Sequence, residues 1–548
     1  MTSRVQRSWR RVLSTFAVAL LILGVAVPLS TGTATRAEAA SYEPITGTGS
    51  TWSQNALDQW RRNVASNYGM TVNYSGVGSS AGRRDFINGS VDFAVSEIPF
   101  QSRPEDGSAP EVPPRGYAYM PIVAGGTAFM YNLKISGKRV TNLRLSGETI
   151  TKIFTGVIKN WNDPAIKADN PGLAMPDKAI VPIYRSDGSG STAQFSLWMS
   201  KQHPDLWNNF CASVGRATPC GLTSQYPQFS GAKGQNGSSG VAGYVAQDYG
   251  EGAITYVEYS YAIEAGFPIA KVLNNAGYYI EPTAQAVAVA LMQAQINQDP
   301  ASADYLTQIL DGVYNNADAR SYPLSSYSYM IVPTAVGGVF TAAKGNSLGT
   351  FGNYMLCEGQ QQAERLGYSP LPMNLVLAGF DQIKRIPGAE SASVDVNTCN
   401  NPTFKPGDSP ASNQLALTAP MPAECDRQGA NQCTSGTGGA SGVETAVSGS
   451  GTGGAATAGN GEVAAAAGGA AAAAGAGDAA VYDEYGNLIS GAVGAIGGAT
   501  SSPFTLAQTG WGGSQMLMLA AALLLIAAMV VPPVIWPRLK RSAERQSS

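Results

Sequence analysis

About a third of the way along, the chain reads Ala179-Ile180-Val181-Pro182-Ile183-Tyr184-Arg185-Ser186-Asp187-Gly188-Ser189-Gly190-Ser191-Thr192. The first six residues are mostly apolar, as in a buried strand. The Gly/Ser/Thr loop that follows leads into a helical pattern over residues 194–200. A strand, a glycine-rich loop and a helix in this order predict a unit of an α/β fold, in which ligands bind at the carboxyl ends of strands.

Two earlier segments have the same arrangement. They read Gly47-Thr48-Gly49-Ser50-Thr51-Trp52 and Gly76-Val77-Gly78-Ser79-Ser80-Ala81-Gly82. Glycine lets backbone amides approach a ligand closely, and the first turn of a helix leaves N–H groups without partners. The helix dipole favours an anion at that end. Each loop alone is also ordinary helix capping, but three together, one with Arg185, predict an anion site.

The loops favour a small oxyanion over a nucleotide. None fits GxxxxGK[ST], because no lysine follows the glycines, and none fits a GxGxxG dinucleotide loop. A site made only of donors suits sulfate, whereas a fixed carboxylate acceptor suits phosphate, which keeps a proton near neutral pH. Glu97, in Val91-Asp92-Phe93-Ala94-Val95-Ser96-Glu97, is the candidate acceptor. The alternative interpretation of Glu97 is a surface acid at a strand end.

Composition excludes several classes of protein. The 548 residues carry a formal net charge of -3, which is not the basic footprint of a nucleic-acid-binding protein. His203 is the single histidine, so a multi-histidine metal site is impossible and a Ser-His-Asp hydrolase would depend on that residue. His203 follows a helical pattern in a turn-like segment, and we expect it to be structural or solvent-facing. We predict no catalytic residue, no metal and no cofactor.

The N-terminus predicts export. Residues 1–39 have the pattern of a signal peptide, with an apolar run over residues 12–27, an Ala37-Glu38-Ala39 cleavage site and four early arginines: Arg4, Arg7, Arg10 and Arg11.

Export implies an oxidising environment, in which cysteines form disulfides. The chain has six cysteines and no C-x-x-C motif: Cys211, Cys220, Cys357, Cys399, Cys425 and Cys433. The short loops favour Cys211–Cys220 and Cys425–Cys433 and leave Cys357 for Cys399, although sequence alone leaves other pairings open.

The C-terminal part differs in composition. Residues 434–505 are rich in Gly, Ala, Ser and Thr and predict a flexible, disordered spacer. Next come Leu506-Ala507-Gln508-Thr509-Gly510, an apolar segment at 516–536 that is long enough to form a transmembrane helix, and a basic tail at 537–548. This order resembles a cell-wall sorting signal, which some sortases cleave between Thr509 and Gly510. The alternative is a retained membrane anchor, and in either case the globular part is extracellular, at the cell surface.

Residues 42–388 resemble the phosphate-binding protein of the ABC-type phosphate-specific transport system, a class II periplasmic-type binding protein. The resemblance is carried by the three loops, by residues 91–97 and by supporting segments at 156–163, 170–173 and 252–259. It implies a two-lobed, type II α/β fold over residues 41–433, in which the chain crosses between the lobes twice and the two crossings form a hinge. Lobe 1 would comprise residues 41–132 and 330–433, and lobe 2 residues 133–329.

By this resemblance, phosphate is bound between the lobes by eight residues: Thr51, the amide of Trp52, Ser79, Glu97, Arg185, Ser189, Gly190 and Ser191. We expect Asp187 to hold Arg185 through an ion pair. Three positions depart from the family pattern: Ser191 replaces Thr, Trp52 replaces Phe, and Glu97 replaces Asp. Because Glu97 is one methylene longer, the preference for phosphate over sulfate is open at this point.

The implied function is that a monomer captures inorganic phosphate outside the membrane and delivers it to an ABC permease. One alternative is the binding of another tetrahedral oxyanion. A different alternative is a surface interaction protein that reuses the fold and is attached by sortase to the cell wall, because a protein fixed to the wall docks on a permease with difficulty.

Overall fold

The computed structural model describes residues 42–104, 107–299, 302, 304–389, 395–445, 481–482 and 488–490. The predicted signal peptide, sorting motif, apolar segment 516–536 and basic tail lie outside these residues, as does most of the predicted spacer. No helix in the described part of the chain is both long and apolar enough to cross a membrane. Beyond residue 445, the described residues form β16 (Val481–Tyr482), which pairs antiparallel with β17 (Leu488–Ser490).

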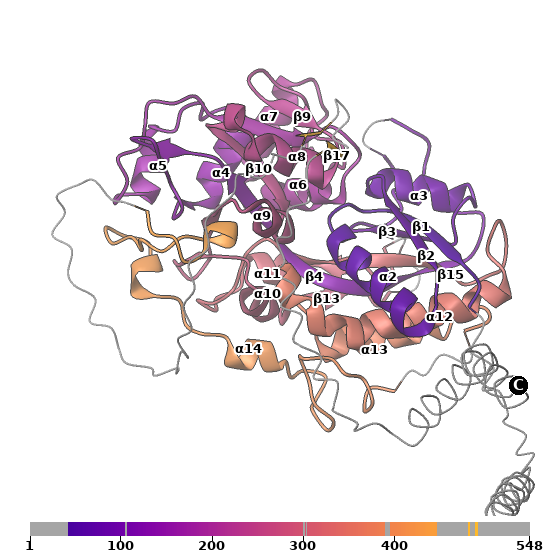
Figure 1. Ribbon diagram of the computed structural model, residues 1–548. Coiled ribbons are helices and arrows are strands. Elements are labelled where there is room, and N and C mark those ends of the chain that lie inside the picture. The colour runs from indigo at the N-terminus through magenta and orange to yellow at the C-terminus, as the bar shows by residue number, and fades with distance from the viewer. Residues whose placement is uncertain are drawn as a thin grey trace, which may run out of the picture. The chain divides into compact units, whose positions relative to one another are not determined.

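Lobe 1 is a sheet covered by helices, on the right in Figure 1. Its strand order is β2-β1-β3-β15-β4, in which β1 is parallel to β2 and β3, and β15 is antiparallel to β3 and β4. Its strands are β1 (Ile45–Gly49), β2 (Val72–Gly76), β3 (Phe93–Ser96), β4 (Tyr117–Tyr131) and β15 (Ser325–Pro333). Its helices are α2 (Gln54–Tyr68), α3 (Ser79–Ile87), α12 (Ala342–Leu356), α13 (Met373–Ile383) and the short η2 (Glu358–Gln362) and η3 (Glu364–Leu366).

Lobe 2 is built around the strand order β4-β10-β8-β9, with β11 also paired to β4. Its strands are β7 (Arg144–Leu145), β8 (Val181–Arg185), β9 (Lys233–Gln235), β10 (Ala253–Glu258), β11 (Ile269–Leu273), β12 (Tyr279–Ile280) and the hairpin β5 (Lys134–Ile135) and β6 (Lys138–Arg139). Its helices are α4 (Gly147–Phe154), α5 (Pro164–Asp169), α6 (Gly190–Gln202), α7 (Pro204–Ser213), α8 (Gly237–Ala246), η1 (Asp248–Gly250) and α9 (Tyr259–Ala265).

The remaining elements lie in the chain between β12 and β15 or near the C-terminus. They are α10 (Ala284–Leu291), β13 (Gln295–Ile296), β14 (Gln308–Ile309), α11 (Asp311–Tyr314), α14 (Gln414–Thr418), η4 (Glu424–Asp426) and η5 (Gly438–Ala440).

The strand β4 belongs to both lobes. Its residues up to Gly126 pair with β15, and its residues from Thr127 onward pair with β10. The chain crosses back between the lobes beside β4 at Leu324, whose carbonyl accepts from the Thr127 amide at 3.0 Å. Two crossings side by side are the arrangement that lets two lobes move about a hinge.

The helices and strands follow the patterns in the sequence. Ala56, Trp60 and Val64 form the buried face of α2, which ends at Gly69 in the left-handed conformation (φ 66°). Helix α6 ends at His203, and Pro204 begins α7. His203 is half-buried rather than exposed, because its ring packs edge-on against Trp198 with centroids 5.2 Å apart.

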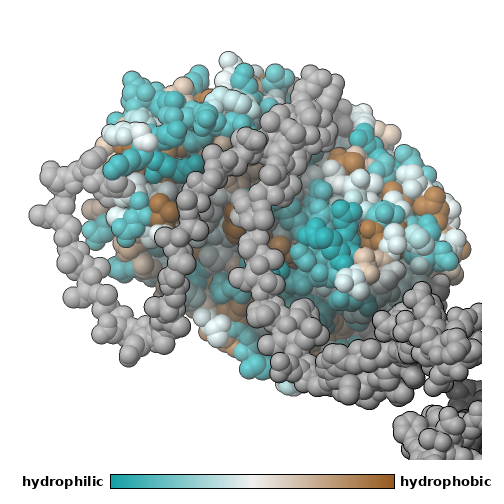
Figure 2. Space-filling model, in the orientation of Figure 1, coloured by the Kyte–Doolittle hydropathy of each residue, from teal (hydrophilic) through white to brown (hydrophobic). Residues whose placement is uncertain are grey.

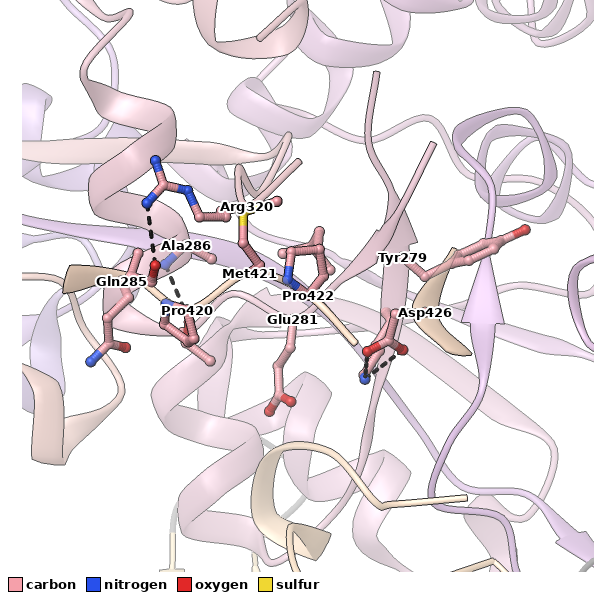
Figure 3. Close-up of a pocket in the computed structure, with 13 residues that line it drawn as sticks. Tyr279, Glu281, Gln285, Ala286, Arg320, Pro420, Met421, Pro422 and Asp426 are labelled. Atoms are coloured by element: carbon pink, nitrogen blue, oxygen red, sulfur yellow. Dashed lines mark hydrogen bonds and ion pairs between the residues drawn. The ribbon is translucent and has the colours of Figure 1, made fainter. Parts of the chain in front are cut away.

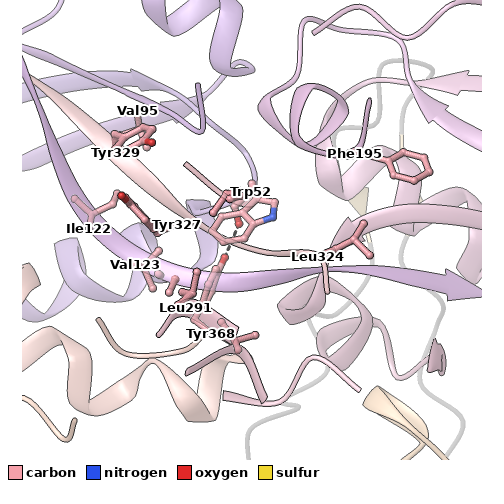
Figure 4. Packing of buried hydrophobic residues seen from close by; sticks show 14 of the residues in the cluster. Trp52, Val95, Ile122, Val123, Phe195, Leu291, Leu324, Tyr327, Tyr329 and Tyr368 are labelled. Carbon is pink, nitrogen blue, oxygen red and sulfur yellow. Dashed lines mark hydrogen bonds between the residues drawn. The ribbon is translucent and has the colours of Figure 1, made fainter. Parts of the chain in front are cut away.

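Trp52 lies in the core next to the crossing strands (Figure 4). The Tyr368 hydroxyl donates to the Trp52 carbonyl at 2.6 Å, and the two rings meet edge to face at 5.8 Å. A Cβ at Gly125 of β4 would lie 2.8 Å from the Trp52 ring, so glycine is required there by close packing. The indole therefore fixes the start of α2 against the hinge.

All three favoured disulfides are present: Cys211–Cys220, Cys357–Cys399 and Cys425–Cys433. The second one ties α12 of lobe 1 to the segment that we call the C-terminal strap, residues 395–445.

The strap ends on lobe 2, which corrects two expected boundaries. Arg144 donates to the carbonyls of Cys425 (3.1 Å) and Asn431 (2.8 Å), although residues up to 433 were expected in lobe 1. Thr437 and Thr445 are buried and bond to Thr141, although composition assigns them to the spacer. The reason is that small Gly/Ala/Thr residues let the backbone lie flat against β11 and α9.

The strap also forms one wall of the pocket in Figure 3, where Pro420, Met421 and Pro422 lie near Arg320. Arg320 donates to the strap carbonyls of Ala416 and Ala419. Where the face in Figure 2 is coloured, hydrophobic residues are scattered among hydrophilic ones, as on most soluble proteins.

Candidate functional site

The three glycine-serine loops meet where the lobes face each other. In lobe 1, the loop after β1 carries Thr51 and Trp52, α3 begins at Ser79, and Glu97 directly follows β3. In lobe 2, the loop after β8 leads into α6, which begins at Gly190. All are therefore at the carboxyl ends of strands or the starts of helices, as the sequence predicts.

Glu97 and Ser79 contact the opposite lobe. The Ser79 hydroxyl donates to Glu97 Oε2 at 2.7 Å and accepts from the Gly190 amide at 3.1 Å. Glu97 is only 1 % exposed, so the interpretation of a surface acid is wrong. A Cβ at Gly190 would lie 1.9 Å from Glu97 Oε2, and glycine is therefore required for the two lobes to come this close.

A second group of contacts joins Thr51 to Arg185 through Ser238. Thr51 Oγ1 lies 2.8 Å from Ser238 Oγ and accepts from the Ser238 amide at 3.1 Å. Arg185 donates from Nη1 to the same serine hydroxyl at 3.3 Å. Ser238 lies in the first turn of α8, so a further helix start faces the site.

Asp187 and Arg185 form the predicted ion pair. Arg185 Nε donates to Asp187 Oδ1 at 2.7 Å, and its Nη2 donates to Oδ2. Burial by itself lowers the pKa of Arg185, but the Asp187 carboxylate raises that pKa by more, so the net shift is upward. Burial likewise raises the pKa of Asp187, and Arg185 outweighs it, so the pKa of Asp187 is lowered. Both groups are thus charged at neutral pH.

Ser189 and Ser191 have different roles at the start of α6. Ser189 is the N-cap, and its hydroxyl accepts from the Thr192 amide at 3.3 Å. Ser191 Oγ is buried and has no hydrogen-bond partner among the described residues. Buried hydroxyls are nearly always bonded, so the Ser191 hydroxyl is a candidate ligand contact. The Trp52 amide, another predicted donor, bonds to Ser50 Oγ at 2.9 Å.

The residues that sequence reasoning missed are Ser50, Ser238 and Ser328. Ser50 lies within the first loop but was not singled out. Ser238 belongs to Asn236-Gly237-Ser238-Ser239-Gly240, a fourth Gly/Ser loop before a helix, and the same signal could have found it. Ser328 is in the middle of β15 and donates to Glu97 at 2.8 Å; no loop motif marks it.

The local chemistry suits an anion with one proton. Helix starts, hydroxyls and a guanidinium offer hydrogen-bond donors, and Glu97 offers one acceptor. In the described part of the chain, no cluster of three His, Cys, Asp or Glu side chains could hold a metal ion.

The chain is similar in sequence to known proteins. The PBP superfamily domain matches residues 34–358. The chain is 31 % identical over 353 residues to phosphate-binding protein PstS of Xylella fastidiosa, a match that covers 64 % of this chain and 88 % of that protein. The chain belongs to the PstS family of the PBP superfamily.

Two further relatives have the same name and a similar match. PstS of Haemophilus influenzae is 31 % identical over 349 residues, covering 64 % of this chain and 94 % of that protein. PstS 2 of Mycobacterium tuberculosis is 30 % identical over 355 residues, covering 62 % and 86 %.

Among solved structures, a high affinity periplasmic phosphate-binding protein bound with phosphate aligns with a TM-score of 0.46 and 18 % identity. That alignment covers 66 % of this chain and all of the other.

Proposed function

We propose that this protein binds inorganic phosphate between its two lobes, outside the cell, and delivers it to an ABC transporter. Membership of the PstS family supports this proposal. The observation that carries it is the position of Glu97, whose carboxylate oxygen Oε2 lies so close to Gly190 at the start of α6 that a Cβ there would be only 1.9 Å away.

The geometry favours phosphate over sulfate. A protonated phosphate donates one hydrogen bond to a carboxylate and accepts the others from Arg185, from Thr51 and from the buried Ser191 hydroxyl. Sulfate has no proton near neutral pH, so its oxygen would face the Glu97 carboxylate without a donor. Such a repulsive contact gives specificity between otherwise similar ligands.

Calorimetric titration of the full-length protein, stripped of bound anion, tests the proposal with phosphate and then with sulfate. We expect tight binding of phosphate and little heat from sulfate. In Glu97→Gln the amide replaces an acceptor oxygen by a donor, so phosphate affinity should fall by about 10- to 100-fold. Sulfate affinity should rise or stay unchanged.

The matched control is Glu43→Gln, because Glu43 is exposed in the segment before β1. It should leave both titrations unchanged. Absence of heat with both anions in the unaltered protein would contradict phosphate binding and favour a displayed protein that reuses the fold.

We also propose that the C-terminus holds the protein at the cell surface. The order of Leu506-Ala507-Gln508-Thr509-Gly510, the apolar segment and the basic tail supports attachment to the wall by a sortase. Mass spectrometry of the mature protein checks this: a chain that ends in wall-linked Thr509 is expected, and a mature chain that keeps residues 510–548 would contradict attachment by a sortase and favour a membrane anchor.

A further inference from the structure

Glu97 is held by three serine hydroxyls from separate parts of lobe 1. Ser50, in the loop after β1, donates to Oε1 at 2.5 Å. Ser328, on β15, donates to the same oxygen at 2.8 Å. Ser79, at the start of α3, donates to Oε2 at 2.7 Å. A carboxylate has about four lone-pair positions, and these bonds occupy both positions of Oε1 and one of Oε2.

The directions of these hydroxyl protons are set by backbone amides. Ser50 Oγ accepts from the Trp52 amide at 2.9 Å, and Ser79 Oγ accepts from the Gly190 amide at 3.1 Å. Each of these two hydroxyls therefore directs its single proton toward Glu97. The Ser328 hydroxyl lies 2.8 Å from Glu97 Oε1 and 3.2 Å from Ser53 Oγ, and the carboxylate is the nearer and stronger acceptor of its proton. Three incoming protons match a carboxylate that accepts hydrogen bonds and donates none.

The backbone of Glu97 is fixed as well. Its carbonyl accepts from the side-chain amides of Gln194 at 2.8 Å and Gln308 at 3.2 Å. With both ends held, the additional methylene of glutamate does not leave the carboxylate free to turn. The oxygen with the open position, Oε2, lies on the side of Gly190.

We propose that Ser50 and Ser328 are positioning residues for the Glu97 side chain. They occupy Oε1 and present the open position of Oε2 to the proton of a bound oxyanion, and so set the preference for protonated over unprotonated tetrahedral oxyanions. This inference rests on the proposed function in phosphate binding, and it assigns the specificity of that site to two residues outside the predicted ligand set.

The test compares Ser50→Ala, Ser328→Ala and the double variant with the unaltered full-length protein. Inorganic phosphate and sulfate are titrated separately into each protein. Without its Oε1 donors, the carboxylate can turn away from the site, so that its repulsion of sulfate weakens. We expect phosphate affinity to fall about tenfold for each serine, and the ratio of phosphate to sulfate affinity to fall in the same variants.

The matched control is Ser326→Ala, two residues along β15. Ser326 is equally buried, and its hydroxyl has no partner among the described residues. This variant should keep the unaltered ratio, and Ser328→Thr, which keeps a hydroxyl, should largely restore the ratio that Ser328→Ala loses. Thermal unfolding shows whether each variant is folded. If the double variant does not fold, the two single variants are sufficient for the test.

The outcomes separate this inference from the proposed function. If the unaltered protein binds phosphate selectively and both alanine variants keep its ratio, the positioning role is refuted and phosphate binding stands. If the unaltered protein binds no phosphate, both proposals fail.

Discussion

The Arg185–Asp187 pair shows how single residues prepare this site for an anion. The Arg185 side chain is 2 % exposed and that of Asp187 14 %. An isolated buried guanidinium is costly, and a carboxylate that holds two of its nitrogens offsets the cost. The pair leaves the guanidinium charged and fixed, with Nη1 directed at Ser238 beside Thr51.

We expect Asp187→Asn to lower the free energy of unfolding by about 3 kcal/mol at pH 7, because Arg185 stays buried without its counter-charge. The pKa of Asp187 is lowered in the folded protein. Its contribution is therefore fully present above its ordinary pKa and is lost as the pH falls below about 4. Urea unfolding at several pH values measures both effects.

The control is Asp381→Asn, which breaks the exposed Lys384–Asp381 pair and should cost little. Equal losses in the two variants, or a loss for Asp187→Asn that does not shrink on acidification, would refute this role of the pair.

At the level of elements, the start of α6 can lie against lobe 1 because its first residue, Gly190, has no side chain. Gly190 occupies the first helical position after the Ser189 cap. It lies so close to Glu97 and Ser79 that a Cβ would overlap both side chains, at 1.9 and 2.8 Å. Its backbone conformation does not require glycine, since φ is not positive, so the requirement comes from the opposite lobe.

Gly190→Ala should therefore prevent the lobes from closing on a ligand while each lobe stays folded. We expect phosphate affinity to fall by roughly 100-fold or more, because overpacking a close contact forces the backbones apart. The melting temperature of the phosphate-free protein should change little. Titration calorimetry and thermal unfolding check the two expectations.

Gly243→Ala is the matched control, because Gly243 is also helical, on α8, and a Cβ there meets no atom within 4 Å. A Gly190→Ala protein that binds phosphate like this control would show that the lobes need not come as close as described.

For the whole molecule, the C-terminal strap is a third connection between the lobes, in addition to the two hinge crossings; it is covalently fixed to lobe 1 and held to lobe 2 by polar contacts. Cys357–Cys399 fixes one end to α12 of lobe 1. On lobe 2, the Lys271–Asp426 ion pair at 2.7 Å and the contacts of Thr141 with Thr445 hold the other end. A tether of fixed length restricts how far two lobes can separate.

We expect cleavage of the strap at a protease site inserted after the exposed Gly407 to increase the radius of gyration of the phosphate-free protein. With phosphate bound, the cut and uncut proteins should have the same radius, because ligand contacts hold the lobes together. Small-angle X-ray scattering measures both states. Equal radii of the cut and uncut proteins without phosphate would show that the strap does not limit opening.

Local patterns in the sequence were sufficient for much of the fold and of the site. The three Gly/Ser loops, the helices α2 and α6 and the strands β2 and β8 depend on neighbouring residues, whose spacing sets the periodicity and the capping. The short Cys211–Cys220 and Cys425–Cys433 loops are local for the same reason. Resemblance to a family then related the loops to one ligand.

Tertiary structure alone decided what surrounds Glu97 and where the strap ends. Ser328 is 231 residues from Glu97 in the chain, and only the antiparallel pairing of β15 with β3 brings the two together. Thr437 and Thr445 look like spacer by composition, yet they are buried because β11 and α9 offer a surface that small side chains fit. Such contacts depend on the shape of residues that are distant in the chain, and the local spacing of residues does not predict that shape.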